Sequence, residues 1–294
     1  MHRKGQTGGP PVHRTVISVD PMLGYIVTLL VVGAVVGVAS GLFGVGGGFL
    51  MVPAQFWALG LLGVDPEIAL RTAFGTSLAV VIPTAASGTW AHACRKCIRW
   101  DAVKWMGLSA GIAALAGAAL STGIPGRPLE LLLGFVLCGA AVQLLAQRAS
   151  CDAGSEERGL SPAGYLAIGV PGGLLSGLLG IGGGIVVVPL LSLLLRYPVR
   201  AAIGTSTPVI LCAAVGGVAG YALTAPAGLL ALPWSIGYVN IPSALALAIA
   251  SVPMAQLGAR VAHACPPRLL RQALAATMVL FGLLMLDLPR LLGF

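Results

Sequence analysis

A glycine-rich stretch that occurs twice constrains the fold of this chain more than any other feature. The first copy, from Ser40 to Pro53, reads S-G-L-F-G-V-G-G-G-F-L-M-V-P. The second copy, from Ser176 to Pro189, reads S-G-L-L-G-I-G-G-G-I-V-V-V-P. The glycines upstream of both copies keep the same register. We therefore predict an internal duplication, on which the rest of the chain can be aligned.

The three consecutive glycines of each copy predict a break in a helix. Glycine loses more conformational freedom in a helix than any other residue and readily adopts positive φ. Inside a bilayer, broken backbone must be buried in protein or line a cavity. Breaks at matching positions of two halves indicate the binding site of a transporter. The candidate substrate-binding glycines are Gly46, Gly47, Gly48, Gly182, Gly183 and Gly184. The alternative is close helix packing, which we favour for the upstream glycines spaced four apart.

The composition indicates a multi-pass membrane protein. Of the 294 residues, 57% are hydrophobic and 9% are charged, whereas soluble domains have about 25% charged residues. The net charge of +8 does not indicate nucleic acid, because basic residues in short loops orient a protein in the lipid bilayer. The polar N-terminal tail has no short apolar segment typical of a cleaved signal peptide. We therefore expect the chain to cross the membrane several times.

The apolar runs predict five segments in each half. In the first half they cover 22–42, 49–63, 67–94, 103–122 and 128–148, and in the second 161–180, 185–196, 199–223, 240–262 and 268–288. Whether 49–63 and 185–196 cross the membrane or return as half-helices stays open at this point. Asp65-Pro66-Glu67 is typical of a helix start. The predicted domains are a tail at 1–20, a first repeat at 21–148, a linker at 149–160 and a second repeat at 161–294.

The distribution of basic residues predicts that the two repeats are inverted. Loop 94–104 carries four basic residues and its counterpart 224–239 carries none, whereas loop 123–128 carries one and its counterpart 260–271 carries three. Basic loops lie on the cytoplasmic side. The predicted fold is an all-α integral membrane protein with two inverted repeats of about five transmembrane segments. This orientation places the N-terminus outside, which the basic residues of the tail do not favour.

At this level of detail the chain resembles a known family. The duplicated G-x-G-G-G-x-x-x-x-P, each copy followed by A-x-G-T-S, resembles the TauE/SafE sulfite exporter family, also called the TSUP transporters. W-A-H-A-C-R-K-C-I-R-W-D from Trp90 and P-P-R-L-L-R from Pro266 also resemble this family. The resemblance implies an inner-membrane permease for small sulfur-containing anions, such as sulfite, thiosulfate or sulfoacetate. The second half departs from the pattern at Pro208, and Tyr221 stands where the first half has His92.

An anion site in this chain has few cationic side chains to use. Every Arg and Lys lies at a segment end or in a loop, where such side chains usually reach the interface. The remaining donors are backbone N–H groups at the broken helices and hydroxyls. The candidate hydroxyls are Thr76, Ser77, Thr205 and Ser206 of the two G-T-S sequences. The alternative for these hydroxyls is hydrogen bonding between helices or to the preceding turn.

Three further residues are candidates for accessory roles. Arg71 and Arg200 lie about one turn before each G-T-S and could guide anions, although anchoring at the membrane end is the alternative. His92 could carry a coupling proton because its pKa is near neutral, or it could be structural. Cys94 and Cys97 form a single C-x-x-C, which is weak evidence for a redox or metal pair. We predict no metal site.

Secondary transport of small sulfur-containing anions is the function that these patterns favour. No nucleotide-binding segment is present to drive it, and we expect neither an enzyme nor a cofactor, because no segment carries a cluster of catalytic polar residues. The expected partners are a small anionic substrate and lipid, and a homo-oligomer is compatible with the sequence. The alternatives are a membrane scaffold without transport activity and a passive anion channel.

Overall fold

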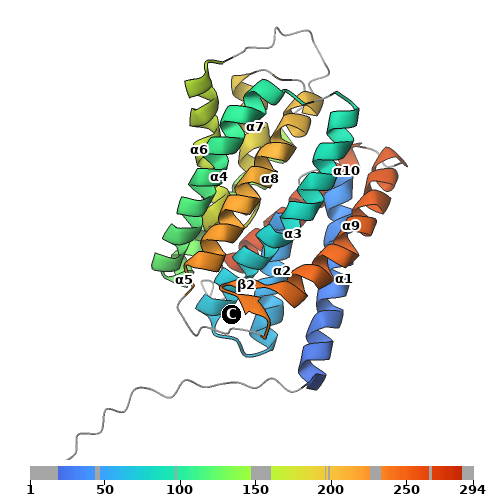
Figure 1. The fold of residues 1–294 in the computed structure, drawn as a ribbon. Helices are drawn as coiled ribbons and strands as arrows, with labels where there is room; N and C mark the ends of the chain where they lie inside the picture. Colours follow the sequence, from blue (N-terminus) through green and yellow to red (C-terminus); the bar gives the residue numbers. More distant parts are fainter. Residues whose placement is uncertain are drawn as a thin grey trace, which may run out of the picture.

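The computed structural model describes residues 19–43, 47–96, 98–146, 160–195, 197, 199–225, 233–264 and 267–286. They form ten α-helices and one short β-hairpin (Figure 1). The first repeat contains α1 (Val19–Phe43), α2 (Gly48–Leu61), α3 (Pro66–Cys94), α4 (Trp100–Gly123) and α5 (Gly126–Ala146). The second repeat contains α6 (Pro162–Leu179), α7 (Gly184–Leu194), α8 (Val199–Leu223), β1 (Ser235–Ile236), β2 (Val239–Asn240), α9 (Ile241–Ala264) and α10 (Pro267–Met285).

Each predicted segment coincides with one of these helices, and the ends agree within a few residues. The helix start at Asp65 is confirmed, because its Oδ1 accepts hydrogen bonds from the N–H groups of Glu67 at 3.0 Å and Ile68 at 3.4 Å. The β-hairpin was not predicted. It begins in the uncharged loop 224–239 and pairs Ser235 with Asn240. Most of the predicted tail, the predicted linker up to residue 159, Gly46 and Cys97 lie outside the described residues.

The second helix of each repeat is a half-helix. Helix α2 has 14 residues, which at 1.5 Å per residue span about 21 Å, and α7 has 11 residues, which span about 16 Å. Both are shorter than the hydrocarbon core of a bilayer, about 30 Å. A recess at the surface is lined by Gly24 and Tyr25 near the start of α1 and by Leu61 at the end of α2. Helix α2 therefore returns toward the end at which α1 begins.

The glycines spaced four apart are confirmed as packing positions. Gly33 on α1 lies against Leu247 of α9, and its counterpart Gly169 on α6 lies against Met106 of α4. One turn later the pattern repeats, with Gly37 against Ser251 and Gly173 against Ala110. Figure 1 shows these neighbours, α1 beside α9 and α4 beside α6. Because glycine has no Cβ, the backbones approach closely there. Each glycine face therefore packs on the fourth helix of the other repeat.

Helices α3 and α8, which carry the two G-T-S sequences, run antiparallel. The N–H of Arg99, at the start of α4, donates to Oγ1 of Thr205 near the start of α8, at 3.1 Å. Since α4 follows directly on α3, the end of α3 lies beside the start of α8. The same bond occurs with the repeats exchanged, from the N–H of Asn240 to Oγ1 of Thr76, also at 3.1 Å. Two inverted repeats require their third helices, α3 and α8, to run antiparallel. The side of the membrane on which each loop lies remains a prediction.

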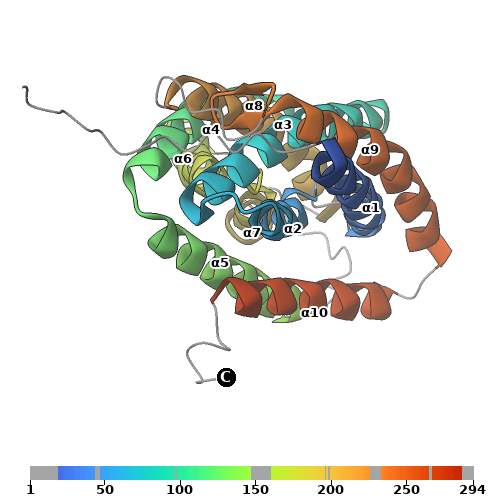
Figure 2. The ribbon, with the colours of Figure 1, turned by 90° about the horizontal axis from the view of Figure 1, so that it is seen from below.

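The outer surface of the bundle is apolar, as expected for contact with lipid. Five of the helices are long and apolar enough to cross a membrane. Large hydrophobic side chains are exposed on several of them, including Ile112 at 65% and Phe135 at 66%. Helices α5 and α10 lie side by side along one edge of the bundle, at the bottom of Figure 2. The protein is thus an all-α, multi-pass membrane protein.

Candidate functional site

Two left-handed glycines at matching positions start the half-helices. Gly47 precedes α2 with φ 68° and ψ −13°, and Gly183 precedes α7 with φ 70° and ψ −8°. Gly182 also has positive φ, at 80°. An L-residue with a side chain is strained in this conformation, whereas glycine is not. The predicted helix breaks are therefore confirmed, and their conformation explains why glycine occupies these positions.

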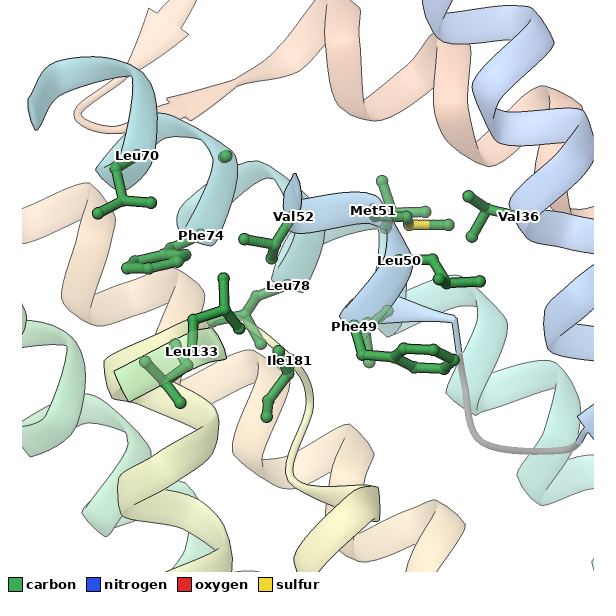
Figure 3. Packing of buried hydrophobic residues seen from close by; sticks show 14 of the residues in the cluster. Val36, Phe49, Leu50, Met51, Val52, Leu70, Phe74, Leu78, Leu133 and Ile181 are labelled. Carbon is green, nitrogen blue, oxygen red and sulfur yellow. The ribbon is translucent and has the colours of Figure 1, made fainter. Parts of the chain in front are cut away.

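The two breaks meet in the interior of the protein. A Cβ built on Gly48 would lie 3.0 Å from the carbonyl oxygen of Ile181, in the second break. Val81 of α3 lies between the two breaks. One of its methyl carbons is 3.2 Å from the Cβ position on Gly48, and the other is 3.4 Å from a Cβ built on Gly182. Figure 3 shows Ile181 close to the start of α2, in the same buried cluster as Phe49. The junction of the two breaks, called here the glycine junction, comprises Gly47, Gly48 and residues 181–184.

The glycine junction places two helix N-termini close together without a side-chain cap on either. Among the residues that the structure describes, no side chain caps the first turn of α2 or of α7, whereas Asp65 caps α3 and Ser161 caps α6. The first N–H groups of a helix have no partner within it and carry partial positive charge. The described residues of the junction are buried. The arrangement therefore presents donors and positive potential in a site shielded from water, which suits a small anion.

The candidate hydroxyls all have partners within the protein. Ser77 donates to the carbonyl oxygen of Gly180 at 2.7 Å and to that of Phe74 at 2.9 Å, which ties α3 to the second break. Ser206 donates to the carbonyl oxygen of Ile203 in its own helix, at 2.9 Å.

The threonines accept from Asn240 and Arg99, as described above, and their own O–H groups have no acceptor among the described residues. Thr76 and Thr205 thus keep a donor, whereas the two serines make the helix-packing and back-bonding contacts that were the alternative.

Arg71 is held at the end of the bundle. Its Nη2 donates to the carbonyl oxygen of Ile124 at 3.1 Å and lies 3.5 Å from a carboxylate oxygen of Glu67. Its guanidinium lies over the ring of Tyr238, 5.9 Å from the centroid, and 12% of its side chain is exposed. These contacts resemble those of a structural anchor, and they place the cation on the same helix as Thr76.

The other accessory candidates lie away from the glycine junction or outside the described side chains. His92 is half-buried in the last turn of α3. The side chain of Arg200 lies outside the described residues. Cys94 is exposed. Among the described residues, no group of three or more His, Cys, Asp or Glu side chains could hold a metal ion.

Five polar side chains that the sequence analysis did not single out have buried atoms without a hydrogen-bond partner among the described residues: Gln55, Thr72, Thr89, Ser176 and Ser251. Two of them, Ser176 and Gln55, bear on the glycine junction. Ser176 is fully buried, its Oγ has no partner, and its Cβ lies 3.3 Å from a Cβ built on Gly183. Gln55 on α2 is also fully buried, and neither its Nε2 nor its Oε1 is bonded. Ser176 is the first residue of the second glycine-rich copy and matches Ser40 in the first, so the duplication could have identified it from the sequence. Gln55 has Leu191 at the matching position of α7, so duplication could not reveal it.

The chain is similar to known membrane transporters over nearly its whole length. It matches the family model described as sulfite exporter TauE/SafE over residues 29–285. A probable membrane transporter protein of Methanocaldococcus jannaschii is 34% identical over 88% of this chain and 94% of its own. Similar proteins of Haemophilus influenzae and Bacillus subtilis are 26% and 24% identical, over 89% and 87% of this chain and 98% and 95% of their own. No solved structure matches the chain significantly. The chain belongs to the TauE/SafE sulfite exporter family and is a membrane transporter, not an enzyme.

Proposed function

We propose that this protein is a secondary transporter of small sulfur-containing anions, such as sulfite, thiosulfate or small organosulfonates, in the cell inner membrane. The anion binds at the glycine junction, near the bilayer midplane. The observation that carries the proposal is the contact between Gly48 and Ile181, which brings the uncapped N-termini of α2 and α7 to one buried place.

The electrostatics of the junction match a compact monoanion. Each helix N-terminus is equivalent to roughly half an elementary positive charge, so two termini together offer about one. Backbone N–H groups from both breaks and the free donor of Ser176 supply the hydrogen bonds. The O–H groups of Thr76 and Thr205 are further donors on the flanking helices. Ser77 and Ser206 hold the backbone around the site.

A site built from neutral donors also favours release. No permanent cation is paired with the anion, so no strong ion pair has to break on each transport cycle. Arg71 and Arg200 lie on the corresponding helices at opposite ends of the bundle and guide anions toward the junction from either side. His92 is the candidate carrier of a coupling proton.

If the two repeats alternate between two packing arrangements, the glycine junction opens first to one side of the membrane and then to the other. The two threonine bonds connect α3 with the start of α9, and α8 with the start of α4. Because these contacts are equivalent in the two repeats, the reversed packing can use the same contacts with the roles of the repeats exchanged.

Flux measurements in proteoliposomes test the proposal. We expect saturable movement of sulfite, thiosulfate or a small sulfonate above the level of protein-free liposomes, measured with and without a pH gradient. Flux that rises in proportion to concentration without saturation would favour a passive channel. No flux of any of these anions in either direction would refute the substrate class and favour a membrane scaffold.

A further inference from the structure

Gln55 is a buried amide that nothing in the described protein satisfies. None of its side chain is exposed, and both Nε2 and Oε1 lack a hydrogen-bond partner. A buried polar group without a partner is costly, and proteins rarely retain one without a use for it. The amide carries two donors and one acceptor. A complete partner must therefore offer both an acceptor and a donor.

Gln55 lies on the face of α2 that meets the glycine junction, about 10 Å further along the helix. Gln55 lies almost two full turns after Gly48, so both residues occupy the same face of the helix. That face meets Ile181 and Val81 at Gly48. Side chains of a helix tilt toward its N-terminus, which for α2 is the break. Figure 3 shows Val52, one turn before Gln55 on this face, directed toward α3.

The second repeat has no equivalent of this amide. Leu191 occupies the matching position of α7 and is fully buried. The backbone donors of the junction are thus duplicated, whereas the side chain with an acceptor is present on one side only. A ligand that extends from the junction along this face of α2 would meet backbone donors from both repeats and one side-chain carbonyl oxygen, that of Gln55.

We propose that Gln55 is a specificity-determining residue that selects oxyanions carrying one O–H group. Its Oε1 accepts a hydrogen bond from that O–H, and its Nε2 donates to an anionic oxygen of the same molecule. Hydrogensulfite has this chemistry, whereas a sulfonate offers acceptors alone and leaves Oε1 unpaired. The inference rests on the proposed function and narrows its substrate class.

One consequence concerns proton coupling. An oxyanion bound with its O–H group carries a proton through the membrane with it. Uptake of such a substrate follows a pH gradient even when no protein side chain titrates. This separates Gln55 from His92, whose removal would then leave the pH dependence of transport unchanged.

The test compares two anions in proteoliposomes. Sulfite is offered at pH values below and above its second ionisation, and methanesulfonate serves as the anion without an O–H group. Wild-type protein should move sulfite faster at the lower pH. Gln55→Leu, which copies the residue of the second repeat, should reduce sulfite flux at least about tenfold, because a site that pairs a substrate O–H discriminates strongly. Methanesulfonate flux should change less than twofold. Leu191→Met, at the matching position, is the control and should move both anions like the wild type.

The outcomes separate this inference from the proposed function. If Gln55→Leu moves both anions like the wild type, the amide has a structural role or binds a buried water, and the inference is overturned although the transporter stands. If wild-type protein moves neither anion, the proposed function fails. In that case, thermal stabilisation of the purified protein by sulfite tests the role of Gln55. Stabilisation of the wild type that is lost in Gln55→Leu supports binding of the anion by Gln55. Equal stabilisation of both proteins, or stabilisation of neither, overturns the inference. Gln55→Met, closer in shape, replaces Gln55→Leu if the latter does not fold.

Discussion

The carbonyl oxygen of Ile181 lies 3.0 Å from the position that a Cβ on Gly48 would occupy. The two broken helices, 133 positions apart in the chain, are therefore in backbone contact. A side chain on Gly48 would press against the backbone of the second break, so the close packing of the two breaks depends on glycine at this position. Both repeats therefore contribute to the glycine junction.

Replacement of the left-handed glycines should impair transport more than folding. Gly47→Val and Gly183→Val each place a branched side chain at positive φ, at a cost of about 1–3 kcal/mol. Gly183→Val adds a clash, because a Cβ there would lie 2.6 Å from the carbonyl oxygen of Gly172. We expect a loss of flux larger than the loss of folded protein, measured by size-exclusion chromatography and proteoliposome transport. Gly139→Ala is the control, because a Cβ there meets nothing within 4 Å and its φ is not positive. Normal folding and transport by both valine variants would exclude the glycines from the site.

The threonine bonds between helices give a second prediction. Thr76→Val removes the acceptor of the buried N–H of Asn240, and Thr205→Val removes the part-buried bond from the N–H of Arg99. An unsatisfied buried donor costs about 1–3 kcal/mol, so Thr76→Val should be the more destabilising of the two. We expect a lower melting temperature and weaker flux in both variants. Thr28→Val is the control, since its exposed hydroxyl bonds only to the preceding turn. If both variants match the parent in flux, these threonines do not contribute to the transport path.

How far the sequence predicted this structure depends on how local each feature is. The break at Gly47 was predictable because consecutive glycines destabilise a helix wherever they occur. The helix start at Asp65 was predictable because its cap lies within three residues. The contact of Gly48 with Ile181 was not, since it depends on how two distant repeats pack. Nor could a pattern of hydroxyls tell that Ser77 bonds to Gly180 in the other repeat.

Gln55 shows a different limit of prediction from the sequence. The sequence analysis gave weight to residues that occur in both repeats. Gln55 has no such support, because the matching position of the second repeat is Leu191. Its importance depends on burial and on the lack of a partner, and both are properties of the packed molecule. The β-hairpin at Ser235–Asn240 was missed for a related reason, because its two-residue strands are too short to show an alternating pattern.

The orientation of the repeats can be tested with single cysteines. Loop 94–104 is predicted to be cytoplasmic and loop 224–239 extracytoplasmic. In a variant that keeps Cys94 alone, which is exposed, an impermeant maleimide should label only after the membrane is permeabilised. In a variant whose single cysteine is Ser235→Cys, labelling should occur in intact spheroplasts. The opposite pair of results would reverse the orientation, and labelling of both before permeabilisation would contradict the inverted arrangement.

Ser176 provides the most direct test of the binding site, because its hydroxyl has no hydrogen-bond partner among the described residues. Removal of this hydroxyl therefore costs the folded protein no hydrogen bond. Ser176→Ala removes a fully buried, unpartnered Oγ beside Gly183. Burying an unsatisfied hydroxyl is unfavourable, so the melting temperature should stay the same or rise. If the hydroxyl donates to a bound anion, the KM for transport should nevertheless increase severalfold, in line with about 0.5–1.5 kcal/mol for a hydrogen bond. Ser109→Ala is the matched control, since that buried hydroxyl donates to the carbonyl oxygen of Met106 at 3.1 Å and lies on α4. It should lower stability with little effect on KM. An unchanged KM in Ser176→Ala, with normal stability, would mean that the anion does not contact this side of the glycine junction.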